Sequence, residues 1–120
     1  ILPLLFVADT LVSEASGTIT EFLATGKTGI IYNLNQESLK HSDGESLLGF
    51  DNRKYLKDSF VHINTPEDLP AGIKLALNPT DEMKKAQKTD KEKIFYKLDG
   101  NASIRVKQIV EKLYSDSIKV

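Results

Sequence analysis

The chain lacks cysteine and tryptophan altogether and has a single methionine in 120 residues. Without cysteine it has no disulfide, no thiolate metal site and no cysteine nucleophile, which suits a reducing cytoplasm. Long apolar runs are also missing, because the run from Ile1 to Val7 is cut short by Asp9. That run is far shorter than the roughly 20 residues of a membrane-spanning helix, and no basic residue precedes it as in a signal peptide. We interpret it as a piece of the core.

An excess of charge of one sign is missing too. The chain has sixteen Lys and Arg residues and seventeen Asp and Glu residues, for a net charge of −1. We therefore expect no nucleic-acid partner, and any phosphate recognition must be local.

An apolar share of 40% is enough for one core, which predicts a single α/β domain over residues 1–120. The chain begins within an apolar run, with neither Met nor a polar tail before it. We therefore expect a fragment of a larger nucleotide-binding domain.

Three short β-compatible runs predict buried strands at residues 10–13, 29–33 and 60–64. Between the first two runs, Ile19, Phe22 and Leu23 recur at helical spacing and predict a helix that ends near Gly26. Strand, helix and strand in so few residues form a βαβ unit with parallel strands and a right-handed crossover. The predicted fold class is therefore α/β, a partial Rossmann-like parallel sheet of about three strands with flanking helices.

Three further helices are predicted after the third strand. Thr65 and Pro66 are typical of a helix start, and that helix should run to Leu77. Residues 80–88 are highly charged and predict a solvated helix. Ser103 is interpreted as the cap of a final helix with an apolar stripe. The stripe consists of Val106, Ile109, Val110, Leu113 and Tyr114.

The turn after the first strand carries the candidate site. A buried strand leads into Ser16, Gly17 and Thr18, and a helix starts at once, so free backbone N–H groups point at one spot. In an open parallel sheet that spot lies beyond the carboxyl ends of the strands, where such folds bind ligands. We assign these three residues to a diphosphate and Glu21, one turn further on, to ribose hydroxyls. The alternative is that Ser16 only caps the helix and Gly17 serves a tight turn.

Three segments carry a resemblance to one family. ADTLVSEASGTITEFLATGKTGIIYN, residues 8–33, resembles the strand, Ser-Ser turn and acidic helix of CDP-glycerol glycerophosphotransferases. NTPEDLPAGIKLAL, residues 64–77, resembles that family's threonine–proline–glutamate–leucine helix, and FYKLDGNASIRVKQIVEKL, residues 95–113, resembles its closing D-G-x-A-S-x-R segment. The resemblance implies the C-terminal portion of a bacterial transferase of the two-domain GT-B type, which uses CDP-glycerol to build teichoic acids of the cell wall.

The resemblance also implies roles for single residues. Ser16 and Gly17 match the Ser-Ser turn that holds the donor phosphates, with Gly17 in place of the second serine. Glu21 matches the acidic residue of the helix, and Arg105 belongs to the closing motif, where it either reaches a phosphate or pairs with an acid of the fold. The catalytic histidines of the family lie in upstream segments. We therefore expect no catalytic residue in this chain and no turnover by it alone.

The two histidines of the chain, His41 and His62, are interpreted as structural, because neither has a carboxylate at acid–base spacing. No metal-ligand pattern is present, and we predict neither a metal nor a cofactor. The partner implied by the resemblance is a nucleotide-activated donor such as CDP-glycerol. The parent protein is expected in the cytoplasm, with peripheral association at the inner face of the cell membrane.

Two alternatives fit the same residues. The Ser16-Gly17 turn also resembles that of UDP-sugar 2-epimerases, which share the GT-B layout and use a Ser-Gly turn followed by an acidic helix residue. A non-catalytic α/β domain that self-associates is the other alternative. An incomplete sheet of about three strands exposes an apolar edge and face that pair readily, which predicts a homodimer of the fragment.

Overall fold

The computed structural model describes residues 2–34, 40, 42–45 and 53–119. Its three strands form one parallel sheet in the order β1-β2-β3. The strands are β1 (Val12–Ser13), β2 (Ile30–Tyr32) and β3 (Val61–Ile63). Val12 is paired with Ile30 across the first ladder, and Ile31 is paired with His62 across the second. All three strands lie inside the predicted runs, and the predicted α/β class is confirmed.

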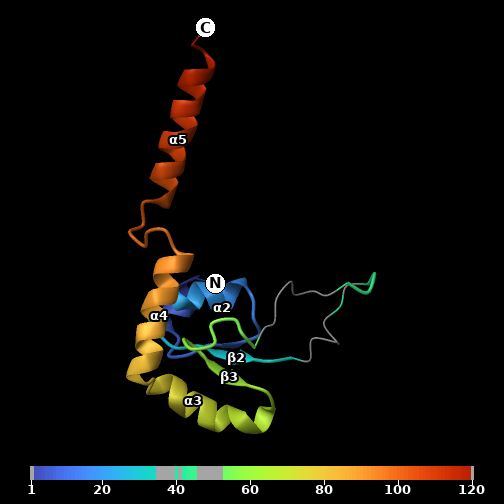
Figure 1. Ribbon diagram of the computed structural model, residues 1–120. Coiled ribbons are helices and arrows are strands. Elements are labelled where there is room, and N and C mark those ends of the chain that lie inside the picture. Colours follow the sequence, from blue (N-terminus) through green and yellow to red (C-terminus); the bar gives the residue numbers. More distant parts are fainter. Residues whose placement is uncertain (1, 35–39, 41, 46–52, 120) are drawn as a thin grey trace.

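The helices surround this sheet on both faces. They are α1 (Leu2–Val7), α2 (Gly17–Leu23), the 3-10 helix η2 (Pro66–Asp68), α3 (Leu69–Leu77), α4 (Asp81–Ile94) and α5 (Ala102–Ser117). Figure 1 shows α2 and α3 on opposite sides of the sheet, α4 alongside it, and α5 projecting away from the body. Among the described residues, no helix has both the length and the apolar character needed to cross a bilayer.

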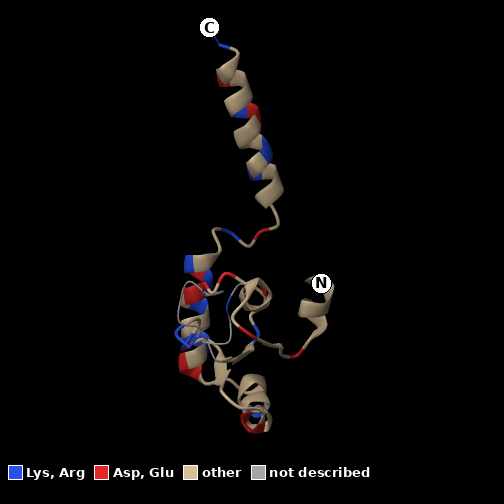
Figure 2. Cartoon of the chain, turned by 90° about the vertical axis from the view of Figure 1, so that its right-hand side faces the viewer, with Lys and Arg blue, Asp and Glu red and all other residues tan. Residues whose placement is uncertain are grey.

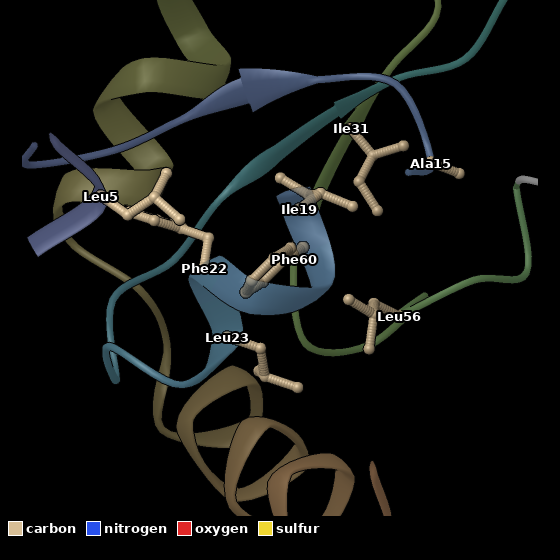
Figure 3. Close-up of a cluster of buried hydrophobic side chains, with 8 residues drawn as sticks. All are labelled: Leu5, Ala15, Ile19, Phe22, Leu23, Ile31, Leu56 and Phe60. Atoms are coloured by element: carbon tan, nitrogen blue, oxygen red, sulfur yellow. The ribbon is translucent and has the colours of Figure 1, made fainter. Parts of the chain in front are cut away.

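One face of the sheet is covered by α2. Ile19, Phe22 and Leu23 are fully buried, as their helical spacing predicted. The ring of Phe22 meets that of Phe60 edge to face, with 6.4 Å between the ring centroids. Figure 3 shows how the buried side chains of this cluster converge on α2. The cluster consists of Leu5, Ala15, Ile19, Phe22, Leu23, Ile31, Leu56 and Phe60.

The other face is covered by α3. Successive side chains of a strand point to opposite faces, so Ile31 faces α2 while Ile30 faces α3. Gly72 brings α3 close to the sheet, because a Cβ there would lie only 3.1 Å from Cγ2 of Ile63. The buried cluster on this face consists of Ile30, Val61, Ile63 and Ala76. β2 therefore contributes to both cores.

The long charged helix α4 is fixed to the sheet by polar contacts. The side chain of Gln87 is only 5% exposed, and its Nε2 donates to Thr28 Oγ1 at 2.7 Å and to the Ser59 carbonyl at 2.9 Å. The Ser59 hydroxyl in turn donates to a carboxylate oxygen of Asp90. Figure 2 shows charges of both signs spread over the rest of α4. The predicted solvated helix is confirmed, and it continues to Ile94.

Local expectations fail at three positions. The apolar run at the N-terminus forms a helix, α1, in which only Leu5 is buried, so it contributes little core. Ser103 does not cap the last helix, because it lies inside α5, whose N-cap residue is Asn101. The Thr65 hydroxyl donates to the Asp68 carboxylate and does not cap a backbone N–H.

Candidate functional site

Ser16 occupies the N-cap position of α2, with an extended backbone at φ −141° and ψ 173°. Its hydroxyl makes no capping bond and lies 3.3 Å from Oγ of Ser13. The first backbone bond of α2 runs from the Thr20 N–H to the Ser16 carbonyl at 3.3 Å. Within the described part of the chain, the N–H groups of residues 17–19 therefore have no acceptor. A merely capping role for Ser16 is not what the structure shows.

The backbone at Gly17 is open to solvent. No heavy atom lies within 4 Å of the place that a Cβ would occupy, and Gly17 is absent from the residues with a positive φ. Neither close packing nor a left-handed backbone requires glycine here, so the tight-turn explanation does not account for it. The exposed N–H of Gly17 is instead accessible to a ligand.

Glu21 and Thr18 complete the predicted set on the same helix. Glu21 is exposed, so its carboxylate faces solvent and not the core. It follows Gly17 by four residues and shares its side of α2, and helical side chains lean toward the N-terminus of the helix. The carboxylate therefore leans toward the turn. Thr18 is half-buried beside it. The structure brings all four predicted residues of the turn together.

Polar side chains that the sequence reasoning did not select adjoin this turn. The Thr20 hydroxyl is hydrogen-bonded to the Tyr55 hydroxyl and also donates to the Ser16 carbonyl at 3.1 Å. This contact joins α2 to a segment 35 residues further along the chain. Sequence spacing carried no signal for Tyr55, because the segment that contains it has no regular period.

A second polar group lies at the carboxyl ends of β2 and β3. His62 Nδ1 is 3.2 Å from Asn33 Oδ1, and the Asn33 amide donates to Asn64 Oδ1 at 3.1 Å. Asn33 and Asn64 each follow directly after a strand, so the rule that ligands bind at the carboxyl ends of parallel strands would have found them. They lie on the same edge of the sheet as the β1–α2 turn.

His62 is the one candidate histidine within the described residues, since His41 lies outside them. Burial lowers the pKa of His62, and the carbonyls of Leu56 and Tyr55 oppose this shift to a smaller extent. Its Nε2 is buried and has no hydrogen-bond partner in the described part of the chain. Asp58 and Glu82 line the same hollow as His62. The structural role of His62 stays a prediction.

Arg105 lies at the base of α5 and pairs there with the Asp99 carboxylate. Its guanidinium also lies over the Tyr96 ring, 5.6 Å from the centroid. Hydrogen bonds from Arg105 and then from the Asn101 N–H lower the pKa of Asp99. Of the two roles expected for Arg105, the pairing with an acid is the one observed.

No metal centre is found among the residues that the structure describes, because no three His, Asp or Glu side chains come together there. Comparisons with protein families, with curated proteins and with solved structures find no match. A functional assignment therefore depends on the geometry of the chain itself.

Proposed function

We propose that this chain is the donor-nucleotide diphosphate-binding part of a glycerophosphotransferase that takes a CDP-glycerol-like donor in cell-wall polymer synthesis. The observation that carries the proposal is the run of unpaired N–H groups at residues 17–19, where β1 turns into α2 and where Gly17 is exposed, Thr18 is half-buried and Ile19 is buried. Backbone N–H groups at such a turn are a common cradle for phosphate oxygens. The resemblance to the glycerophosphotransferases supplies the identity of the donor.

Different residues of the turn are proposed to contact the diphosphate and the ribose of the nucleotide. The N–H groups of the exposed Gly17 and the half-buried Thr18 donate to diphosphate oxygens, and the hydroxyls of Ser16 and Thr18 add two further donors. Because α2 has only seven residues, its macrodipole is weak and the individual N–H donors provide most of the attraction. The Glu21 carboxylate repels phosphate and accepts hydrogen bonds from hydroxyls. Its place is therefore at the ribose.

The chain is proposed to bind and not to turn over its donor. The catalytic histidines of the resembled family belong to upstream segments, and His62 is half-buried, with its Nε2 enclosed. Binding to the chain alone should be weak, because half of a nucleotide site contributes only part of the contacts. For the parent protein we propose a cytoplasmic location, with peripheral contact at the inner face of the membrane.

Titration of the chain with CDP, followed by amide chemical shifts, tests the proposal. Saturable shifts should appear at the N–H groups of residues 17–19 and fade along α2. Gly17→Pro removes one of these donors, while proline suits the first helical position and the extended backbone of Ser16 suits the residue before it. CDP binding should weaken about tenfold, the effect of a lost hydrogen bond to a charged group.

Gly17→Ala is the matched control, because it adds a carbon at the same place and keeps the N–H group. The open space around residue 17 accommodates the methyl group, so folding should be unaffected. Equal CDP affinity of the proline and alanine variants, or shifts confined to other parts of the chain, would contradict the proposal.

The Ser16-Gly17 pair gives a second candidate, a part of a UDP-sugar 2-epimerase-like enzyme. A serine at position 17 would meet no neighbouring atom, so Gly17→Ser tests the two candidates without disturbing the fold. In the glycerophosphotransferase the second serine should preserve or strengthen binding, with CDP preferred over UDP. In the epimerase-like enzyme the serine should weaken binding, with UDP preferred.

A further inference from the structure

The apolar stripe of α5 is exposed along its whole length. No residue of α5 is buried, and its five stripe side chains are between 58% and 67% exposed. They are Val106, Ile109, Val110, Leu113 and Tyr114. The helix has 16 residues, and most of the stability of helices in proteins comes from the packing of an apolar face. A stripe of this regularity is typical of a helix that packs against another surface.

A hollow of about 390 Å³ lies where α5 joins the body, and it extends the apolar surface of the stripe. Its walls are mainly apolar, with the basic groups of Lys97 and Arg105 at its rim. Both of these cations lie over the Tyr96 ring, at 5.3 and 5.6 Å from the centroid. The apolar walls are formed by Ile94, Phe95, Tyr96, Ala102, Val106 and Ile109. The occupant therefore needs an apolar face and acidic flanks.

The charges of α5 are arranged against its own dipole. Arg105 lies in the first turn and Asp116 in the last, whereas an isolated helix is stabilised by acids at its start and bases at its end. The first half also carries Lys107, for a net charge of +2, and the second half carries Glu111 and Lys112 besides Asp116, for a net charge of −1. An antiparallel neighbour with the same sequence would set the net-negative half beside the net-positive half at both ends.

From these observations we propose that α5 pairs antiparallel with α5 of a second copy of this chain. In that pairing the stripes cover each other, and the net-negative second half of each helix, with Asp116 near its end, lies over the hollow of the other copy beside Lys97 and Arg105. A twofold axis makes the two halves of the interface identical, as in most homodimers. A parallel pairing would instead bring Arg105 and Lys107 against the same residues of the other copy. The antiparallel orientation follows from charge, and the contact itself from the apolar stripe.

Sedimentation of the full chain over a range of concentrations tests the pairing. The wild-type chain should change from monomer to dimer as the concentration rises. Leu113→Glu, in the middle of the stripe, should raise the dissociation constant at least about tenfold. Ser115→Glu is the matched control, because residue 115 lies on the opposite side of the helix and should leave the dimer intact. Thermal unfolding of both variants monitors the α/β body.

Orientation can be tested by cross-linking, because the chain has no cysteine of its own. Ser103 and Ser117 lie at opposite ends of α5 on the same flank of the stripe. A mixture of Ser103→Cys and Ser117→Cys chains should cross-link between the two variants when α5 pairs antiparallel. A chain that stays monomeric at every concentration, or one that cross-links chiefly between identical variants, would overturn the proposal.

Discussion

The side-chain amide of Gln87 donates to the hydroxyl of Thr28, although the two residues lie 59 positions apart. Thr28 precedes β2, and the second bond of Gln87 goes to the Ser59 carbonyl, two residues before β3. One buried amide therefore joins α4 to the amino ends of two strands. The contact fixes the end of the sheet opposite the candidate site, so it contributes to the site only by holding the strands in register.

The first prediction concerns this amide. Replacing Gln87 with Leu leaves the Ser59 carbonyl buried without a donor, which should lower the free energy of unfolding by about 1–3 kcal/mol. Urea denaturation measures the loss. Gln108→Leu, on the exposed surface of α5, serves as the control and should stay within about 0.5 kcal/mol of the wild type. A Gln87 variant as stable as the control would show that the buried bonds are not needed.

The second prediction concerns the close approach of α2 and the segment before β2. A Cβ at Gly29 would lie 2.9 Å from both Ile19 Cδ1 and Phe60 Cε2. Gly29→Ala should therefore overpack the larger core and lower the free energy of unfolding by about 1–3 kcal/mol. Gly17→Ala provides the comparison, because the same methyl group meets open space there. Equal stabilities of the two alanine variants would contradict the packing of this core.

The third prediction compares two residues at N-cap positions. Thr80 Oγ1 accepts a hydrogen bond from the Met83 N–H at 3.2 Å, whereas the Ser16 hydroxyl makes no such bond. Thr80→Ala should cost about 1 kcal/mol of stability, and Ser16→Ala should cost much less. Because Ser16 is assigned to ligand binding, its loss should instead weaken CDP binding. A large loss of stability in the Ser16 variant would restore the capping explanation.

The fourth prediction concerns pH. Burial lowers the pKa of His62 in the folded chain below its ordinary value of 6.5. Above pH 6.5 the His62 ring is neutral in the folded and in the unfolded chain, so its protonation does not reduce the free energy of unfolding. As the pH falls below that value, the unfolded chain takes up a proton that the folded chain resists, so stability declines. Denaturation at about pH 7.5 and about pH 5.5 should show a smaller decline in His62→Gln than in the wild type.

His41 is present in both proteins, so the difference between their pH dependences reports on His62 alone. Parallel pH profiles of the two proteins would mean that His62 titrates alike in the folded and unfolded chains.

Local periodicity was sufficient to predict the elements around the sheet. The helical spacing of Ile19, Phe22 and Leu23 predicted α2 and its buried face, and the apolar runs predicted the three strands. The burial of Gln87 was not predictable, because α4 reads as a uniformly charged helix and its contacts lie far away in sequence. Likewise, the apolar stripe predicts that α5 packs against another surface. The stripe alone does not reveal that no described residue of the same chain covers it.

The candidate site was predictable to the extent that it is local. The β1–α2 turn was placed by strand and helix signals alone. The structure adds that the hydroxyl of the N-cap residue Ser16 makes no capping bond and that no neighbouring atom requires glycine at position 17. Tyr55 reaches the same edge only through a tertiary contact, its hydrogen bond with Thr20. The sequence left two roles open for Arg105, contact with a phosphate and pairing with an acid. The structure shows its ion pair with Asp99.

The position of β2 between two cores has a consequence for how the chain loses its structure. Ile30 and Ile31 are both fully buried, one on each face, so separating either helix from the sheet exposes a neighbour on the same three-residue strand. The sheet, α2 and α3 should consequently open as a single cooperative unit. Because α5 shares neither core, its melting should be independent of theirs. With the proposed pairing of α5, its melting should depend on protein concentration, whereas that of the α/β body should not.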